Sequence, residues 1–140
     1  MKRSEIPDMA REIRDKLNPL FLEEGLKLVL LFGSIARGKV HEKSDIDLAF
    51  LFDEPVDILG LTNKVTRFLQ SDRVDVVDLK RASPLLKFCA AKEGVVLYER
   101  APGLFNNFYS LAFRRYVDTK KLRNAQEEII NHFLEERGLA

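Results

Sequence analysis

Short continuous apolar runs alternate along the chain with segments whose apolar residues recur at helical spacing. From Ser4 to Leu17 the apolar residues recur three to four positions apart, which predicts a helix that Ser4 can cap. Leu26 to Phe32 is a continuous apolar run closed by Gly33, a pattern typical of a strand covered on both faces. A second run, Ile46 to Phe52, ends at two acidic residues and a proline and predicts a second strand.

The following segments continue the alternation of strand and helix. Spacing predicts a helix over Val56 to Leu69, a valine-rich strand over Val74 to Leu79 and a helix over Leu85 to Ala91. Gly94 then stops the helix, and a last strand runs from Val95 to Tyr98. This order favours an α/β or α+β sheet with helices on at least one face.

The end of the chain is helical in pattern. Residues 104–137 carry a long apolar stripe, with a break expected near Asp118 and Thr119. A length of 140 residues suits one domain, so we expect residues 1–140 to form a single unit with a core over about 20–100 and a helical tail over about 104–137.

Composition and charge exclude several classes of protein. Hydrophobic residues make up 46% and charged residues 32%, which is typical of a globular chain. The 23 basic and 22 acidic residues leave no global field for extended nucleic acid or an anionic membrane. One cysteine, Cys89, and two distant histidines give no zinc-ligand spacing. No apolar run approaches the roughly 20 residues that span a bilayer, so we expect a cytoplasmic protein.

The candidate chemistry lies between the first two strands. Gly33 closes the first strand, and Ser34 to Gly38 is expected to start a short helix, where backbone N–H groups and the Ser34 hydroxyl suit a phosphate. Ten residues later come Asp45 and Asp47, whose side chains leave the same face of a strand about 6–7 Å apart at the backbone. Two such carboxylates repel unless a divalent cation neutralises them.

A third carboxylate is expected from the strand over Val74 to Leu79. Asp75 and Asp78 are an odd number of residues apart, so an unbroken strand points them to opposite faces and only one can join the first pair. Asp75 lies in the middle of the strand and is favoured. Asp78 lies near its end, where capping or solvation is easy. Three carboxylates with two Mg²⁺ ions suit nucleotidyl transfer from a nucleoside triphosphate.

These motifs resemble the minimal nucleotidyltransferase (MNT) group of the DNA polymerase β-like superfamily. The resemblance runs from about Leu26 to Glu99 and is weaker around residues 115–118. It implies a polymerase β-like fold, a small mixed sheet with helices mainly on one face. By position it implies triphosphate binding at Gly33 and Ser34, metal ligation at Asp45 and Asp47, and a third catalytic and metal-binding carboxylate at Asp75. Arg37, in the following turn, either contacts the triphosphate or is solvated.

The same resemblance implies a partner. Many members of the group are encoded beside a HEPN-domain toxin and act as its antitoxin by adding AMP from ATP, with Mg²⁺, to a tyrosine of the toxin. Two alternatives remain: an antitoxin that acts by binding alone, or transfer to a small molecule. Arg114 to Arg123 is a basic stretch that lies among aromatic residues, and it is either a solvated helix face or a surface for a partner. A homo-oligomer also stays open.

Overall fold

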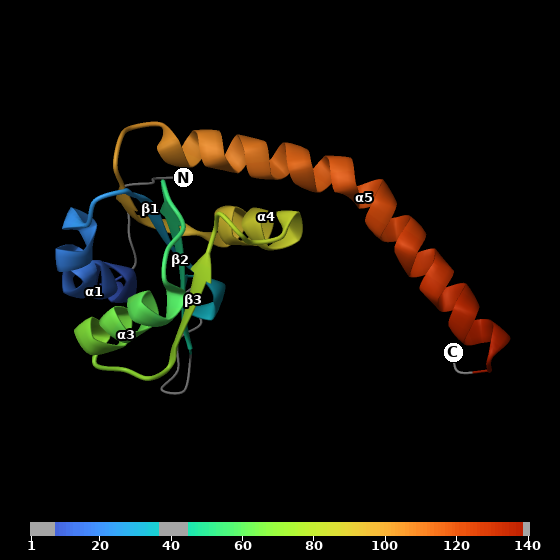
Figure 1. Ribbon diagram of the computed structural model, residues 1–140, viewed down its shortest axis with the longest axis horizontal. Coiled ribbons are helices and arrows are strands. Elements are labelled where there is room, and N and C mark those ends of the chain that lie inside the picture. The colour runs from blue at the N-terminus through green and yellow to red at the C-terminus, as the bar shows by residue number, and fades with distance from the viewer. Residues whose placement is uncertain (1–7, 37–44, 139–140) are drawn as a thin grey trace.

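The computed structural model describes residues 8–36 and 45–138 of the chain and shows one four-stranded sheet (Figure 1). The strands are β1 (Leu26–Phe32), β2 (Ile46–Phe52), β3 (Val74–Asp78) and β4 (Val95–Glu99). The helices are α1 (Asp8–Leu17), the 3-10 helix η1 (Asn18–Leu22), α2 (Gly33–Ala36), α3 (Ile58–Leu69), α4 (Pro84–Glu93) and α5 (Leu104–Glu136). The strand order is β3-β2-β1-β4. β1 runs antiparallel to β2 and β4, whereas β2 and β3 are parallel, which confirms the expected mixed sheet.

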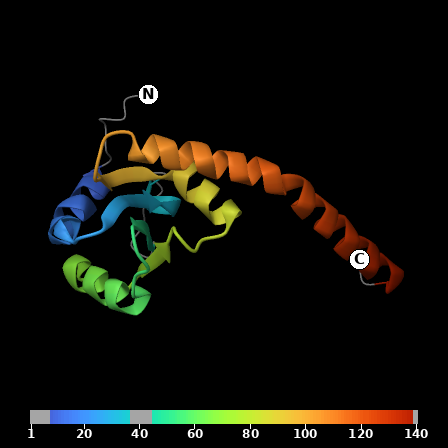
Figure 2. The ribbon, with the colours of Figure 1, turned by 45° about the horizontal axis from the view of Figure 1, so that its top comes forward.

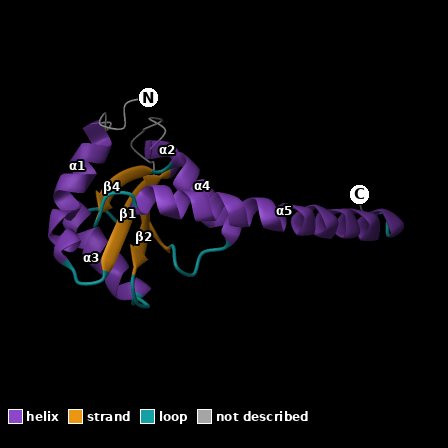
Figure 3. Cartoon of the chain, turned by 90° about the horizontal axis from the view of Figure 1, so that it is seen from above, coloured by secondary structure: helices purple, strands orange, loops and turns teal. Residues whose placement is uncertain are grey.

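Both faces of the sheet are apolar, and helices cover both. α1 and α3 pack on one face, with Ile13 and Val65 buried against Leu48 and Phe50. α4 and the start of α5 pack on the other face, which includes Leu30 and Ala49 (Figures 2 and 3). The expectation of helices mainly on one face was therefore too narrow. The continuous apolar run of β1 requires cover on two sides.

The local signals account for most helix boundaries. Ser83 caps α4, because its Oγ accepts a hydrogen bond from the Leu86 N–H at 3.2 Å and Pro84 occupies the first turn. α3 begins at Ile58, two residues later than predicted, and ends at Leu69, where Gln70 follows in the left-handed conformation. The turn η1 was not predicted. The cap expected at Ser4 lies outside the described residues.

The tail is one unbroken helix, so the break expected near Asp118 and Thr119 was wrong. The Thr119 hydroxyl donates to the backbone carbonyls of Arg115 and Tyr116 at 3.0 and 3.2 Å, and it accepts a hydrogen bond from Arg123. Its polar side chain is thus satisfied inside the helix and does not need to cap a new one. Although α5 has 33 residues, neither it nor another helix of the described ranges is apolar enough to cross a membrane.

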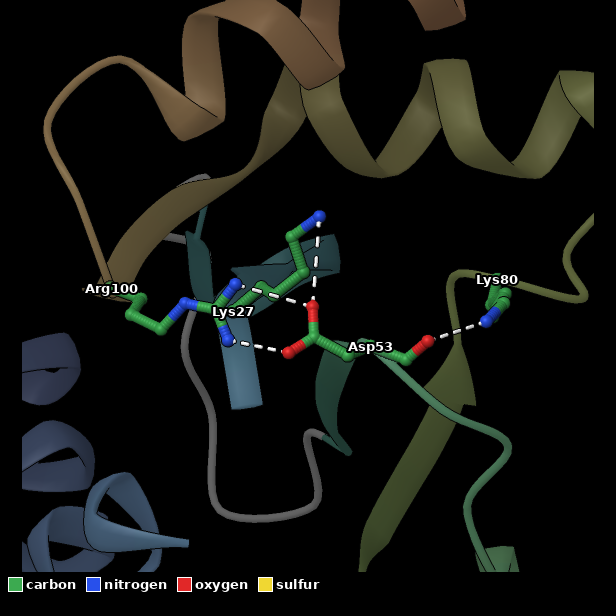
Figure 4. Close-up of polar contacts among 4 residues, drawn as sticks. All are labelled: Lys27, Asp53, Lys80 and Arg100. Carbon is green, nitrogen blue, oxygen red and sulfur yellow. Dashed lines mark hydrogen bonds and ion pairs between the residues drawn. The ribbon is translucent and has the colours of Figure 1, made fainter. Parts of the chain in front are cut away.

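Polar contacts at one end of the sheet join β1 to the segments that follow β2, β3 and β4 (Figure 4). The guanidinium of Arg100, just after β4, donates two hydrogen bonds to the Asp53 carboxylate at 2.6 and 3.2 Å. Lys27 of β1 lies 3.9 Å from the same carboxylate, and Lys80 donates to the Asp53 carbonyl at 2.6 Å. The hydrogen bond from Arg100 is the main reason why the pKa of Asp53 lies below its ordinary value of 3.8.

We predict that Asp53→Asn lowers the midpoint of thermal unfolding by a few degrees at neutral pH. A carboxylate whose pKa is lowered by folding stabilises the fold above its ordinary pKa of 3.8 and loses this effect as the pH falls through its lower folded pKa. The difference between the wild type and the variant should therefore shrink below about pH 4 in thermal melts followed by circular dichroism. Glu54→Gln, at the adjacent exposed carboxylate, is the control. An equal loss in both variants would contradict the prediction.

Candidate active site

The site begins where β1 ends, at Gly33. Phe32, the last residue of β1, is the register partner of Asp47 on β2. Gly33 has φ +79°, and a Cβ placed there would collide with Oδ2 of Asp47 and lie 3.0 Å from its Cγ. Two features therefore require glycine at position 33: the left-handed backbone and the close approach of the backbone to the Asp47 carboxylate. The helix expected after the strand is present as α2.

The structure places Asp75 beside Asp47. These residues are register partners on the parallel strands β2 and β3, which lie about 4.8 Å apart. Side chains two residues further on, Ala49 and Val77, belong to the apolar cluster under α4 and α5, so both carboxylates lie on that face of the sheet. Asp47 is partly buried and Asp75 is exposed at the sheet edge.

Asp45 lies immediately before β2 rather than within it, and its side chain is exposed. The start of the strand is held by a hydrogen bond from the Ile46 N–H to the carbonyl of Arg73, at 2.9 Å. This positioning role of Arg73 was not found from the sequence, because a backbone carbonyl carries no side-chain signal. Asp45 and Asp47 therefore lie two residues apart at one end of β2, and of the two only Asp47 is a register partner of Asp75.

Asp78 does not join this group. Its register partner is Phe50, whose side chain lies in the core on the other face of the sheet. The Asp78 carboxylate instead accepts a hydrogen bond from the Lys80 N–H at 3.0 Å and stabilises the turn after β3. The alternation that separates Asp75 from Asp78 is therefore present in the structure, while the catalytic role of Asp75 stays a prediction.

Two predicted nucleotide contacts are not fully described. Ser34 lies in α2 with its backbone described, but its side chain and the whole of Arg37 lie outside the described residues. For these two positions the predicted contacts with a triphosphate stay predictions.

The chemistry of the donor set fits a divalent cation. Carboxylate oxygens are the ligands that Mg²⁺ prefers, and Mg²⁺ in nucleotide-dependent enzymes is held by one or two of them together with phosphate oxygens and water. Gly33 leaves the space beside the Asp47 carboxylate free of a side chain of its own. Among the residues that the structure describes, no three His, Cys, Asp or Glu side chains lie close enough to enclose a metal ion by themselves.

A hollow of about 240 Å³ lies elsewhere, between η1 and α3. It is lined by Pro19, Leu20, Glu23, Lys64, Arg67 and Phe68. Leu20 and the buried residues of α3 belong to the core on the face opposite the carboxylates. Because the hollow contains none of the predicted site residues, the arrangement of Gly33, Asp47 and Asp75 defines the candidate active site.

Comparison with known proteins identifies the family of the chain. Residues 15–103 match the family described as "Polymerase beta, Nucleotidyltransferase", which is more than half of the chain and contains all the predicted site residues. The chain therefore belongs to the polymerase β nucleotidyltransferase family, and it is a nucleotidyltransferase.

The relatives narrow the group within this family. Protein adenylyltransferase MntA of Aphanizomenon flos-aquae is 32% identical over 127 residues, which cover 81% of this chain and 84% of the relative. MntA of Shewanella oneidensis is 44% identical over 64 residues, which cover 44% of this chain and 45% of the relative.

Solved structures show the same fold. A toxin–antitoxin structure with AMP-PNP contains a chain that superposes with a TM-score of 0.73 at 28% identity, covering 86% of this chain and 97% of the other. The structure of the tri-AMPylated HEPN toxin of Shewanella oneidensis in complex with an MNT antitoxin contains a chain that superposes with a TM-score of 0.71 at 26% identity. The superposition covers 87% of this chain and 98% of the other. These findings confirm the predicted polymerase β-like fold.

We predict that Gly33→Ala weakens binding of AMP-PNP at least about tenfold in titration calorimetry with Mg²⁺, because the new methyl group displaces the Asp47 carboxylate. Gly25→Ala is a matched control. Gly25 also has a positive φ, +86°, but no atom of the described residues lies within 4 Å of the place where its methyl group would be. The control therefore introduces the same kind of backbone strain without disturbing the site. Equal loss of binding in both variants would show that strain alone is responsible.

Proposed function

We propose that this chain is a protein adenylyltransferase that transfers AMP from ATP to a tyrosine hydroxyl of a HEPN-domain toxin and thereby acts as its antitoxin. The observation that carries the proposal is the meeting of Gly33, Asp47 and Asp75 at one end of the sheet. A backbone free of side-chain bulk next to aligned carboxylates suits a nucleoside triphosphate with its cations. The relatives named as protein adenylyltransferases and the structures of toxin–antitoxin complexes support this choice of acceptor.

Each site residue has a proposed role. Gly33 and Ser34 would bind the outer phosphates through backbone N–H groups, and Arg37 would contact the triphosphate. Asp45 and Asp47 would hold Mg²⁺, two ions in the full site, with Asp75 as a further ligand. Bound Mg²⁺ would neutralise the negative charge of the triphosphate and of the pyrophosphate leaving group. A carboxylate oxygen of Asp75 would accept the proton of the acceptor hydroxyl as its oxygen attacks the α-phosphorus.

The exposure of the site agrees with a protein acceptor. Asp75 is exposed on the edge strand β3, where a side chain presented by another protein can reach it. We further propose that residues 1–140 work as one nucleotidyltransferase domain with a helical tail, located in the cytoplasm, where ATP is available.

The reaction is tested by incubating the chain with its genomically neighbouring HEPN protein, labelled ATP and Mg²⁺. We predict that the wild type labels the partner and that Asp75→Asn reduces the initial rate by at least about a hundredfold, as expected for loss of a general base. Asp78→Asn is the matched control on the same strand. It removes a negative charge but keeps an oxygen that can accept the turn hydrogen bond from the Lys80 N–H, so it should keep the rate within a few-fold.

Two results would contradict this prediction. Absence of label on the partner with the wild-type chain would rule out the adenylyltransferase proposal for this acceptor. A normal rate in Asp75→Asn with loss of rate in folded Asp78→Asn would reverse the assignment of the third carboxylate.

The second candidate function is neutralisation of the partner by binding alone. The first half of α5 favours it, because Phe113 and Val117 are about half exposed beside the basic residues Arg114 and Arg115, and arginine and aromatic side chains are enriched at protein interfaces.

We predict that a variant with Asp45→Asn and Asp47→Asn fails to relieve the toxicity of the HEPN protein in co-expression growth assays while still binding it in a pull-down. Removing two carboxylates lowers the affinity for the cation but leaves α5 unchanged. Full relief of toxicity by this variant would instead support neutralisation by binding.

A further inference from the structure

The segment between α3 and β3, residues 70–73, lies at the end of the sheet that holds the candidate site. In Figure 1 it leads from the end of α3 to the lower end of β3. Its last residue, Arg73, directly precedes β3, and the Arg73 carbonyl accepts the hydrogen bond from the Ile46 N–H at 2.9 Å. The segment therefore holds the start of β2 as well as the start of β3.

The three carboxylates of the candidate site all lie beside this hydrogen bond. Asp45 and Asp47 flank Ile46 directly, and Asp75 follows Arg73 by two residues. The register that pairs Asp47 with Asp75 begins at the same bond. A change in the position of the Arg73 carbonyl would therefore alter the distance between the two β2 carboxylates and Asp75.

The hydroxyl of Ser71 holds the backbone of Arg73. Ser71 Oγ accepts a hydrogen bond from the Arg73 N–H at 3.1 Å, and the Ser71 side chain is partly buried. Serine hydroxyls stabilise turns in this way, by bonding to a backbone group two residues away. The N–H of Arg73 is thus bonded to the turn, and its carbonyl is bonded to β2.

The end of α3 holds Ser71 in its turn. Gln70 has φ +53°, and its N–H donates to the Arg67 carbonyl at 3.3 Å. The Ser71 N–H donates to the Thr66 carbonyl at 3.2 Å. These two bonds and the left-handed residue form a Schellman cap. Because Leu69, the last residue of α3, is buried in the core, the core itself sets the place of Ser71.

We propose that Ser71 is a positioning residue for nucleotidyl transfer. Through the backbone of Arg73, it holds the start of β2 where its carboxylates align with Asp75. This role depends on the proposed function of those carboxylates, and it requires no contact of Ser71 with the nucleotide or the cation. A misplacement of about 1 Å in a catalytic group can lower a rate about a hundredfold. Loss of the hydroxyl should therefore slow the reaction in a protein that is still folded.

The test compares three substitutions in the full chain. Ser71→Ala removes the acceptor oxygen, Ser71→Thr keeps it, and Ser83→Ala is the matched control. Ser83 also accepts a backbone N–H through its Oγ, at 3.2 Å, but it caps α4, beyond the end of β3 that lies away from the site. Thermal melts followed by circular dichroism show that each variant is folded. Ser83→Ala should lower the midpoint at least as much as Ser71→Ala, because it removes a helix cap.

Hydrogen exchange of single backbone amides, measured by NMR without nucleotide, reports on the start of β2. The internal reference is the Asp53 N–H, which follows the other end of β2 and donates to the Gly25 carbonyl at 2.8 Å. In Ser71→Ala the ratio of the Ile46 rate to the Asp53 rate should rise at least about fivefold over the wild type. In Ser71→Thr and Ser83→Ala this ratio should stay within about twofold of the wild type.

The second measurement is the rate at which the HEPN partner is labelled from ATP. Ser71→Ala should lower kcat at least about fivefold and keep KM for ATP within about twofold, because the proposed phosphate contacts at Gly33 and Ser34 are unchanged. Ser71→Thr should restore kcat. Ser83→Ala should keep kcat despite its lower midpoint of unfolding.

Three results would overturn the proposal: an unchanged ratio of exchange rates in Ser71→Ala, a normal kcat in this variant, or an equal loss of kcat in Ser71→Ala and Ser83→Ala. Absence of labelling by the wild type would instead contradict the proposed acceptor. The exchange ratio needs neither nucleotide nor partner, so in that case it alone decides whether Ser71 positions β2.

Discussion

The register of β2 between its two neighbours is the constraint on which the site depends. Asp47 is paired with Phe32 on one side and with Asp75 on the other, so one residue position connects the end of β1 to the edge of the sheet. This register is held by the alternation of Leu48 and Phe50 into one core with Ala49 into the other. A slip of one residue would turn Asp47 into the apolar core, so the same packing that stabilises the sheet also orients the carboxylate.

Charged groups lie at the two ends of the sheet because its middle is apolar, and the groups at each end make different contacts. β1 is buried on both faces and leaves no room for a charged group between its ends. At one end, Asp53 and Arg100 tie β2 to the segment after β4. At the other, Gly33 brings the backbone against Asp47. The ion pair of Asp53 and Arg100 thus lies at the end of the sheet away from the site. The carboxylates at the candidate site are left to bind a ligand.

Features that depend on neighbouring residues could be predicted from the sequence, whereas features that depend on contacts within the folded structure could not. The bounds of β1 and β2 were predicted to the residue, because each apolar run stops at a glycine or an acidic residue, and alternation along β3 separated Asp75 from Asp78. The continuity of α5 was missed because it depends on the hydrogen bonds of Thr119 to its own helix. The collision that a side chain at Gly33 would cause was also beyond the sequence, since it depends on the pairing of two strands. The roles of Ser34, Arg37 and Asp45 stay predictions.

The exposed carboxylate of Asp75 has a consequence for solubility. β3 is an edge strand, and an edge of valine-rich backbone with unpaired N–H and C=O groups is a template for strand addition by another molecule. A charged side chain in the middle of such a strand opposes edge-to-edge association, because stacking the strands of two molecules would bring like charges together. The carboxylate for which we propose a catalytic role would thus also keep the sheet from growing, and loss of its charge would expose the chain to aggregation through β3.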